Sequence, residues 1–413
     1  VAPFKAQNMA LNSFITPEGG EMGRAQLVQA EAASIEPHVD MNPILLKPTS
    51  NVVSQFILHG KVLGNFTAEE YYQKKSDLVT QVMESYRRME SQYQVLVLEG
   101  AGSAAEINLR DKDLVNFSMA ERVQAPVLLV ADIDRGGVFA SIVGHMELFT
   151  PAERELVKGF IINKFRGDPS LLRSGLEFLE TRTGKPVLGL VHYYKDIHIP
   201  EEDSVALDLK MRVTKERSQE QVRIGVIRLP HISNYTDFDS LEQEPSVDLI
   251  YFTAPEQVFD MDLVVLPGSK NTLNDLRYLH NQGIAEAIIS FHAKGGTVVG
   301  ICGGYQMLGR KVLDPLGVES DLQEITGLGL LDMETELLGE KVTTQVRARL
   351  LWPELADTAD QVHGYEIHMG QSRVLGPATP LLEIVERNGE PVQVKDCLLY
   401  TSPSPRDFSC NLV

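Results

Sequence analysis

The feature that most constrains this fold is a set of short apolar runs that occur in two series along the chain. Each run is followed closely by glycine, asparagine or aspartate. The runs are continuous valine, isoleucine and leucine rather than alternating patterns, which is typical of strands buried on both faces of a parallel sheet. The first series is Val95 to Leu98, Val127 to Ala131, Phe160 to Ile162 and Val187 to Val191, and the second is Ile224 to Leu229, Leu249 to Phe252, Leu263 to Leu266 and Val298 to Ile301. The runs therefore predict an α/β protein.

Helical patterns lie between the runs. Residues 69–92 place apolar side chains on one stripe, as a helix that covers a sheet requires, and residues 284–292 show the same pattern. A charged, polar stretch at 210–221 separates the two series and reads as a linker. We therefore predict two doubly wound domains with mainly parallel sheets, at 1–214 and 222–396.

Composition excludes several classes of protein. The 413 residues carry a net charge of −19, which argues against nucleic acid or an anionic membrane as the main partner, although a local basic pocket remains compatible with it. No apolar run is long enough to span a membrane, and no signal peptide is visible. The three cysteines, Cys302, Cys397 and Cys410, fit neither a zinc site nor a disulfide framework, so we expect a cytoplasmic protein.

Cys302 stands where a buried strand runs into the sequence Cys-Gly-Gly-Tyr-Gln. A nucleophile on a sharp turn needs small neighbours, and Gly300, Gly303 and Gly304 supply them. A helix that begins near Tyr305 would lower the thiol pKa from about 8.5 through its dipole, and backbone amides after the turn could hold an oxyanion. The alternative is a small core cysteine at a strand end. The glycines favour the nucleophile.

A second strand ends in the sequence Leu-Pro-Gly-Ser-Lys-Asn-Thr, where the amides of Gly268 and Ser269 can face a carbonyl oxygen. Such a strand end is usually only a turn. Together with the cysteine, however, it resembles the class I glutamine amidotransferase domain. That resemblance implies that Cys302 attacks the side-chain amide of L-glutamine, that a histidine serves as its base, and that ammonia is released.

The family's catalytic histidine belongs to a late stretch resembling Gly-x-Tyr-x-His-Gly, which this sequence does not contain. His363 and His368 occur in a segment that resembles an earlier, structural or substrate-facing element of the family, and we do not expect either to be the base. Residues 397–413 stand where the histidine stretch should begin. We interpret them as a non-native tail produced by a frame break or fusion, the alternative being a divergent natural terminus.

Acidic residues end two strands of the first series. Glu99 lies between a buried strand and Gly-Ala-Gly-Ser, so a phosphate and Mg²⁺ could approach it closely; the alternative is a capping or ion-paired glutamate. Asp132 and Asp134 end the next strand, with both side chains on one side of an extended segment. Arg135 and two glycines follow, which suits an anionic ligand.

Asn163 and Lys164 end the following strand, and this pair resembles the adenine-reading element of some P-loop ATPases. No Gly-x-x-x-x-Gly-Lys-Ser/Thr motif occurs in the sequence. The segment Val1 to Phe14 would be the second strand region of such a fold. We therefore expect the first strand, phosphate loop and helix to have been cut away.

Several motifs in order carry a closer resemblance over almost everything from Val1 to about Lys395. They are VAPFKAQNMALNSF, EMGRAQLVQAEA, LEGAGS, ADIDRGGVFAS, NKFRGD, LPGSKNT, ICGGYQML and HGYEIHMG. Together they are similar to the cobyric acid synthase family of the cobalamin pathway, in which a dethiobiotin-synthetase-like ATPase domain precedes the amidotransferase domain. PFKAQNMALNS discriminates against the sister family that makes cobyrinic acid a,c-diamide.

The resemblance implies a specific reaction. ATP phosphorylates a side-chain carboxylate of a corrinoid, adenosylcobyrinic acid a,c-diamide, and ammonia from glutamine then displaces phosphate, at the b, d, e and g positions. It also implies roles for individual residues: Cys302 as nucleophile, Glu99 and Glu21 as Mg²⁺ ligands, Lys5 near the reacting phosphate, and Asp132 or Asp134 with the substrate.

Three other readings stay open. A related amidotransferase-ligase could act on another carboxylate, such as a cell-wall precursor, although its amidotransferase typically pairs with a separate ligase chain. A second alternative is a ParA-like ATPase or a binding scaffold, neither of which would use Cys302 as a nucleophile. The chain as given could also be an inactive fragment of the enzyme. The sequence is compatible with a homo-oligomer.

Overall fold

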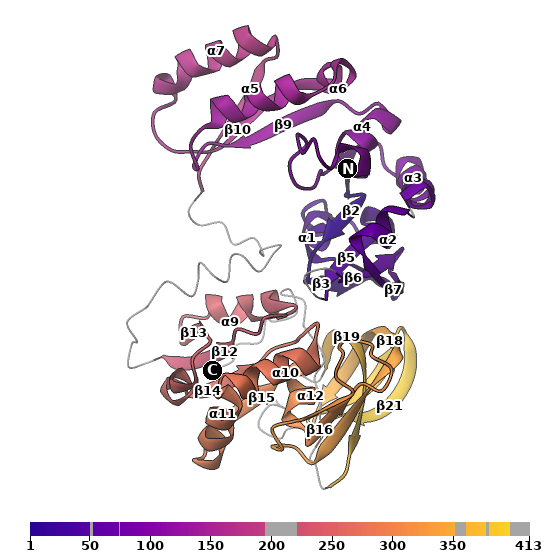
Figure 1. Ribbon diagram of the computed structural model, residues 1–413, viewed down its shortest axis with the longest axis vertical. Helices are drawn as coiled ribbons and strands as arrows, with labels where there is room; N and C mark the ends of the chain where they lie inside the picture. Colours follow the sequence, from indigo (N-terminus) through magenta and orange to yellow (C-terminus); the bar gives the residue numbers. More distant parts are fainter. Residues whose placement is uncertain (50–52, 74, 195–220, 352–360, 377–379, 397–413) are drawn as a thin grey trace. The chain divides into compact units, whose positions relative to one another are not determined.

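The computed structural model describes residues 1–49, 53–73, 75–194, 221–351, 361–376 and 380–396 (Figure 1). The described residues form two compact units, and neither is continuous in sequence. The first contains residues 1–8 and 72–194, and the second contains residues 9–71 and 221–396. The predicted linker lies almost entirely outside the described residues, as does the interpreted tail at 397–413.

The first unit contains two parallel strand groups. β1 (Ala2–Phe4) pairs with β8 (Leu96–Leu98), and β10 (Val157–Phe165) lies between β9 (Val127–Asp132) and β11 (Val187–His192). The helices of this unit are α3 (Lys75–Gln92), α4 (Phe117–Val123), α5 (Val138–Leu148), α6 (Pro151–Leu156) and α7 (Arg173–Thr183). All four strands predicted in the first series are confirmed. The helical pattern predicted at 69–92 is divided between α2 (Ala68–Gln73) and α3, and residue 74 lies outside the described residues.

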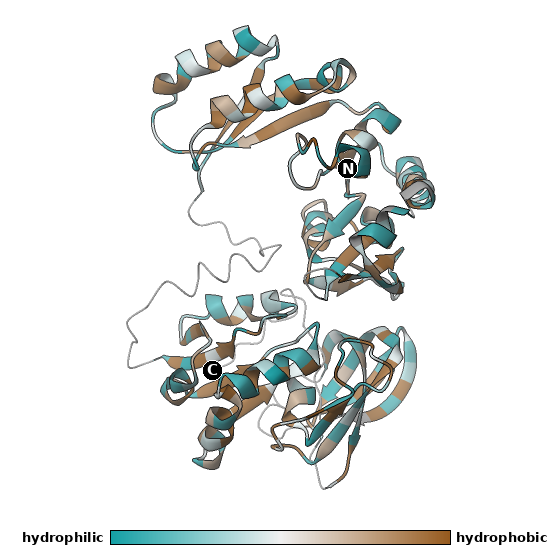
Figure 2. Ribbon diagram, viewed as in Figure 1, coloured by the Kyte–Doolittle hydropathy of each residue, from teal (hydrophilic) through white to brown (hydrophobic). Residues whose placement is uncertain are grey.

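One expectation about this unit is wrong, because its strands are not buried on both faces. Ile142 and Phe160 lie in a core that α5 and α7 cover from one side. On the other face of β9, however, Leu128 and Val130 are 48% and 56% exposed. Figure 2 shows the apolar colouring of these strands. A continuous apolar run predicts two-sided burial, but within the described residues helices cover only one face.

The second unit is built around a four-stranded parallel sheet in the order β13-β12-β14-β15. These strands are β12 (Val222–Ile227), β13 (Val247–Phe252), β14 (Leu263–Leu266) and β15 (Thr297–Gly300), and the helices are α9 (Asp239–Gln243), α10 (Thr272–Asn281), α11 (Ile284–Ala293) and α12 (Gly303–Leu308). Val264, Leu276 and Ile288 are fully buried in the core between the sheet and its helices. The second series of predicted strands is confirmed, and α11 confirms the predicted helix at 284–292.

A second, largely antiparallel sheet in this unit was not predicted. Its members are β16 (Lys311–Leu313), β17 (Glu324–Thr326), β18 (Met333–Leu350), β19 (Val362–Val374), β20 (Leu382–Arg387) and β21 (Glu390–Asp396). The long strand β18 pairs with both β19 and β20. This sheet lies next to α12 and carries β19 over the end of the parallel sheet where the cysteine is found.

Residues 9–71 also belong to the second unit, although they come from the amino-terminal half of the chain. They form β3 (Ser13–Ile15), β4 (Glu21–Gly23), α1 (Arg24–Ala32), β5 (Ile44–Pro48), β6 (Val53–Leu58) and β7 (Lys61–Thr67); β2 (Gln7–Met9) and α2 (Ala68–Gln73) stand where the chain passes between units. The hydroxyl of Tyr365 donates to the Ser13 carbonyl at 3.4 Å, and Thr343 donates to the Gly19 carbonyl at 3.1 Å. A single domain boundary near residue 214 did not anticipate this packing, and that boundary stays a prediction.

No helix among the described residues combines the length and apolar character needed to cross a bilayer.

Candidate active site

Cys302 occupies a sharp turn between β15 and α12. Its backbone has φ 50° and ψ −113°, a conformation that costs a non-glycine residue on the order of 1–3 kcal/mol. The glycines around it are required by close packing. A Cβ on Gly304 would lie 2.0 Å from the Leu266 carbonyl oxygen, and one on Gly300 would lie 2.6 Å from the Tyr305 Cα. The structure therefore confirms the crowded, strained turn that the sequence predicted.

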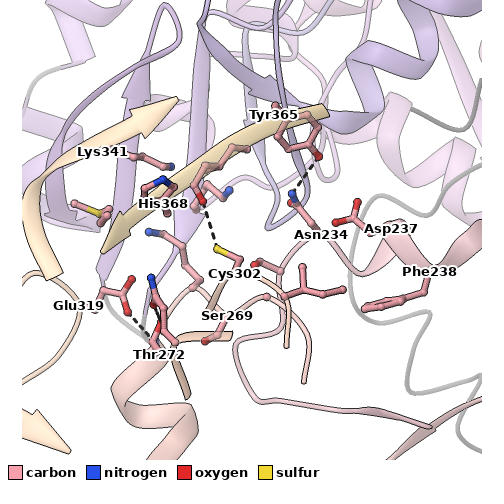
Figure 3. Close-up of a pocket in the computed structure, with 18 residues that line it drawn as sticks. Asn234, Asp237, Phe238, Ser269, Thr272, Cys302, Glu319, Lys341, Tyr365 and His368 are labelled. Atoms are coloured by element: carbon pink, nitrogen blue, oxygen red, sulfur yellow. Dashed lines mark hydrogen bonds between the residues drawn. The ribbon is translucent and has the colours of Figure 1, made fainter. Parts of the chain in front are cut away.

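The turn presents Cys302 to a cavity between the parallel sheet and β19 (Figure 3). Gly268 and Ser269 line the same cavity, and a Cβ on Gly268 would lie 3.8 Å from that of Cys302. The Gly303 amide donates a hydrogen bond to the thiol. On the opposite side, the thiol donates to the Ile367 carbonyl of β19 at 3.4 Å. Both loops predicted from sequence thus meet at one cavity.

The electrostatics of the thiol differ from the prediction. Burial, together with the negative charge of Glu319, raises the pKa of Cys302 to about 11, although the Gly303 amide and the cations of Lys47 and Lys341 oppose this shift. The expectation that the helix dipole lowers this pKa is wrong for the present arrangement. The α12 helix has only six residues, and the desolvation of a thiolate outweighs its dipole.

Buried charged side chains surround the thiol, and the sequence reasoning missed most of them. Lys47, Lys270, Lys341 and Glu319 all line the cavity. Burial lowers the pKa of Lys270, and burial raises the pKa of Glu319, which accepts a hydrogen bond from the Thr272 amide at 2.7 Å. A lysine inside an apolar strand, as at Lys47 in Ile-Leu-Leu-Lys-Pro, is the sequence signal that could have pointed to this cluster.

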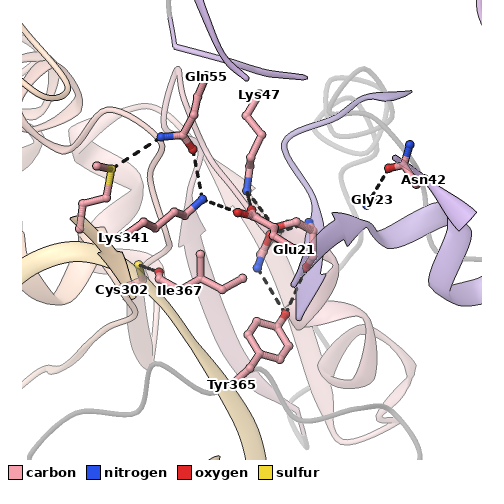
Figure 4. A network of polar contacts seen from close by, with 12 residues as sticks. Glu21, Gly23, Asn42, Lys47, Gln55, Cys302, Lys341, Tyr365 and Ile367 are labelled. Carbon is pink, nitrogen blue, oxygen red and sulfur yellow. Dashed lines mark hydrogen bonds and ion pairs between the residues drawn. The ribbon is translucent and has the colours of Figure 1, made fainter. Parts of the chain in front are cut away.

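Glu21 was expected to be a metal ligand, and the structure gives it a different environment. Its side chain is fully buried in the second unit, where Lys47 contacts one carboxylate oxygen at 2.9 Å and Lys341 contacts the other at 2.5 Å (Figure 4). Although burial opposes it, the attraction of these two cations leaves the pKa of Glu21 below its usual range. Both oxygens pair with ammonium groups, so Glu21 is an ion-pair partner in this structure, and its role as a Mg²⁺ ligand stays a prediction.

The two late histidines differ in position. His363 is exposed, whereas His368 lines the cavity on β19, next to Ile367. Nδ1 of His368 lies 2.8 Å from the Gly370 carbonyl. Because a carbonyl only accepts, Nδ1 carries the proton and Nε2 is the basic atom of the neutral ring.

The acidic strand ends of the first unit form a second candidate site. Because β1 and β8 are parallel neighbours, Lys5 and Glu99 follow the carboxyl ends of adjacent strands, and their side chains are 3.1 Å apart. Lys5 is buried, whereas the Glu99 side chain is 39% exposed. The structure thus brings together two residues that the family resemblance placed at the reacting phosphate.

Strands β9 and β10 contribute the other predicted residues of this unit. Asp132 and Asn163 are register partners, and Lys164 lies 3.0 Å from Asp132. Although burial by itself raises the pKa of Asp132, the hydrogen bond from Lys164 and its positive charge lower it overall. Asp134 pairs instead with Arg166 at 2.8 Å. The four residues share one sheet edge, but each carboxylate has its own cation.

No group of three or more histidine, cysteine or acidic side chains that could hold a metal occurs among the described residues. A Mg²⁺ that carries a nucleotide needs only one or two protein carboxylates, because phosphate oxygens and water complete its shell. Glu99, half-exposed at a strand end, fits that requirement.

The fold and the cavity define a class. A strained cysteine at the end of a parallel sheet, with backbone amides beside it, is the arrangement of a thiol-dependent amidotransferase. Comparison with family models agrees: residues 223–410 match the CobB/CobQ-like glutamine amidotransferase domain, and residues 1–205 match the CobQ/CobB/MinD/ParA nucleotide binding domain.

Curated relatives identify the family. A cobyric acid synthase of Syntrophobacter fumaroxidans is 59% identical over 97% of this chain and 78% of its own length. Relatives of the same name from Photorhabdus laumondii and Bacteroides fragilis are 55% and 50% identical, over 94% and 93% of this chain and 76% and 77% of their own lengths. The chain belongs to the cobyric acid synthase family, and the resemblance found in its sequence is confirmed.

Proposed function

We propose that this chain carries out the ATP- and glutamine-dependent amidation that makes cobyric acid, in the cytoplasm. The substrate is adenosylcobyrinic acid a,c-diamide, and the b, d, e and g carboxylates become amides. The observation that carries this proposal is the strained Cys302 turn with Gly268 and Ser269 at one cavity, in a chain whose relatives share the name cobyric acid synthase.

In the second unit, the Cys302 thiolate attacks the side-chain carbonyl of glutamine and expels ammonia, leaving a thioester that water hydrolyses to glutamate. The Gly303 amide and the Gly268–Ser269 turn are placed to stabilise the oxyanion of each tetrahedral intermediate. A base must remove the thiol proton, because the pKa of Cys302 lies near 11. The family resemblance gives that role to a late histidine, and we do not expect His368, which lines the cavity, to replace it.

In the first unit, a corrinoid carboxylate takes the γ-phosphoryl group of ATP, giving an acyl phosphate and ADP, and ammonia then displaces inorganic phosphate. A bound Mg²⁺ would neutralise charge on the phosphoryl group. Glu99 would hold that ion, and Lys5, fixed beside it, would contact the phosphate. Asp132 or Asp134 would position the substrate, and Asn163 and Lys164 would contact the nucleotide.

The direct test is transfer of nitrogen. A version supplied with a phosphate loop and a Gly-x-Tyr-x-His-Gly stretch is given ATP, Mg²⁺, the corrinoid and glutamine labelled with ¹⁵N in its side chain, and the product is examined by NMR. The label should appear in four amides and only when ATP is present. Amidation of a cell-wall precursor carboxylate but not of the corrinoid would instead support a related amidotransferase-ligase.

We also propose that the 413-residue chain as given is a poor catalyst. The sequence holds no Gly-x-x-x-x-Gly-Lys-Ser/Thr motif, whose amides and lysine hold phosphates, and no Gly-x-Tyr-x-His-Gly stretch. General acid–base help is worth about 10²–10⁴-fold, so only a trace of glutamine hydrolysis should remain. A version supplied with both motifs should use glutamine, and one supplied with the phosphate loop alone should use ammonia. Robust glutamine-driven synthesis by the unaltered chain would contradict this proposal and assign the base to His368.

A further inference from the structure

Three buried titratable side chains near the cysteine form a network in the second unit, in which two lysines contact one glutamate (Figure 4). Glu21 accepts from Lys47 at 2.9 Å and from Lys341 at 2.5 Å. Lys47 also donates to Ser13 at 2.8 Å, and Lys341 donates to Gln55 at 3.1 Å. Each side chain of the trio is at least 93% buried, with exposures of 0%, 4% and 7% for Glu21, Lys47 and Lys341. The two ammonium groups are therefore fixed in place.

Both lysines of this network reach the thiol cavity. Lys47 and Lys341 line it together with Cys302, and the positive charge of each favours the thiolate. Burial lowers the pKa of Lys341 to about 7, so this side chain is fully charged only below that pH. The other charged or titratable side chains that line the cavity are Asp237, Lys270, Glu319, Tyr365 and His368. Glu319 opposes the thiolate, so the lysines are the groups that offset it.

The members of the network come from both halves of the sequence. Glu21 lies on β4 and Lys47 on β5, within residues 1–205 that match the nucleotide binding domain, whereas Lys341 lies on β18 of the amidotransferase match. Burying three charges is a weak way to stabilise a fold, because desolvation offsets most of the attraction. The position of these three side chains next to the cavity is therefore better explained by an effect on the thiol than by a contribution to stability.

We propose that Glu21, Lys47 and Lys341 are a positioning network that holds positive charge against the Cys302 thiol, so that residues of the nucleotide-binding half set the reactivity of the amidotransferase cysteine. This inference rests on the proposed function, in which Cys302 is the nucleophile. Glu21 anchors the two lysines, and the lysines act on the thiol through their charge.

Thiol reactivity tests the network without any enzyme assay. The chain carrying Cys397→Ser and Cys410→Ser is treated with 4,4′-dithiodipyridine across a range of pH; the thiolate forms a mixed disulfide and releases thiopyridone, which is followed by absorbance. The variants are Lys47→Gln and Lys341→Gln, which keep a hydrogen-bond donor for Glu21 but remove the charge. Lys61→Gln, at an exposed position on β7, is the matched control.

Below about pH 7, each neutral variant should react about tenfold more slowly than the parent, while the control matches the parent. Burial lowers the pKa of Lys341 to about 7, so the effect of Lys341→Gln should fade above that pH, whereas Lys47→Gln should displace the pH profile upward by about one unit. Lys47→Arg and Lys341→Arg, which keep the charge, should recover most of the rate. Neutral variants that react like the control would overturn the proposal. A neutral variant that loses its near-UV circular dichroism is not folded, and the arginine variant at that position then tests the proposal. A folded arginine variant that still reacts tenfold more slowly than the parent would overturn the proposal.

The outcome is separable from the proposed function. If glutamine-driven synthesis survives loss of the Cys302 thiol, the proposed function is contradicted, independently of the results for the lysine variants. If the lysine variants leave the pH profile of thiol reactivity unchanged, only the proposed positioning network is contradicted.

Discussion

The two candidate sites of this chain differ in how their charges are held. Near Cys302, Glu21, Lys47 and Lys341 are almost fully buried, and both lysines pair with Glu21. At the strand ends of the first unit, the Glu99 side chain is 39% exposed and Lys164 is 47% exposed. A buried ion pair that loses one partner leaves an uncompensated charge, whereas an exposed pair loses about 0–1 kcal/mol. The cysteine region should therefore couple chemistry to stability, and the strand-end region should not.

Glu99→Gln gives the largest effect expected in the strand-end region. The variant lacks the carboxylate charge, so its rate of synthesis from either glutamine or ammonia should fall on the order of 10²-fold or more. The reason is that a metal that stabilises phosphoryl charge contributes several kcal/mol. Steady-state rates in a version with a phosphate loop measure this. Urea unfolding should change less than for a variant of the buried network around Cys302, although the buried Lys5 loses its Glu99 partner; Asp134→Asn is the control. A large loss of unfolding free energy in Glu99→Gln would contradict the expected difference between the two regions.

Glu366→Gln probes the buried region through pH. Burial tends to raise the pKa of Glu366, but the neighbouring His368 and hydrogen bonds from Arg387 and Thr344 lower it from 4.5 to about 2. A lowered carboxylate pKa contributes stability that is present above pH 4.5 and lost as pH falls towards 2. The variant should lack up to about 3 kcal/mol of unfolding free energy at pH 7 and converge with the parent near pH 2.

Denaturant unfolding at several pH values measures this difference, with exposed Glu390→Gln as the control. A parent and a Glu366→Gln variant that stay parallel from pH 7 to pH 2 would show that this carboxylate is not stabilised in its charged form.

Gly304→Ala tests the packing of the cysteine turn. The new methyl group would lie 2.0 Å from the Leu266 carbonyl oxygen, so the turn must shift, and overpacking of this kind costs about 1–3 kcal/mol. Thermal unfolding should show the loss. Gly144→Ala in α5, where no atom lies within 4 Å, is the matched control and should be neutral or slightly stabilising. Equal behaviour of the two variants would mean that the turn is not close-packed.

Glu319→Gln should give the smallest effect and the opposite sign. Because the negative charge of Glu319 raises the pKa of Cys302, its removal should speed the reaction of the thiol with 4,4′-dithiodipyridine by about tenfold at fixed pH. The amide oxygen can still accept from Thr272. A slower or unchanged reaction would show that Glu319 acts on the thiol only through packing.

The sequence predicted the parallel strands and the Cys302 turn because both depend on local patterns: apolar runs and glycine spacing. It did not predict the antiparallel sheet of β16 to β21, whose long strands such as β18 alternate partly buried and exposed residues without turn signals. Glu21, Lys47 and Lys341 are 26 to 320 residues apart, and only the fold brings them together. Glu21 was predicted as a Mg²⁺ ligand from the family resemblance, and nothing in the sequence indicated that two distant lysines would be its partners.

The central claim is that Cys302 frees ammonia from glutamine for a separate ATP-dependent site. The most direct measurement compares Cys302→Ala with its parent, in a version supplied with the phosphate loop and the histidine stretch, using glutamine and ammonium chloride as alternative nitrogen sources. Glutamine-driven synthesis should be abolished, because no other described cysteine is present, and ammonia-driven synthesis should match the parent. A variant that still uses glutamine at the parent's rate would contradict the account.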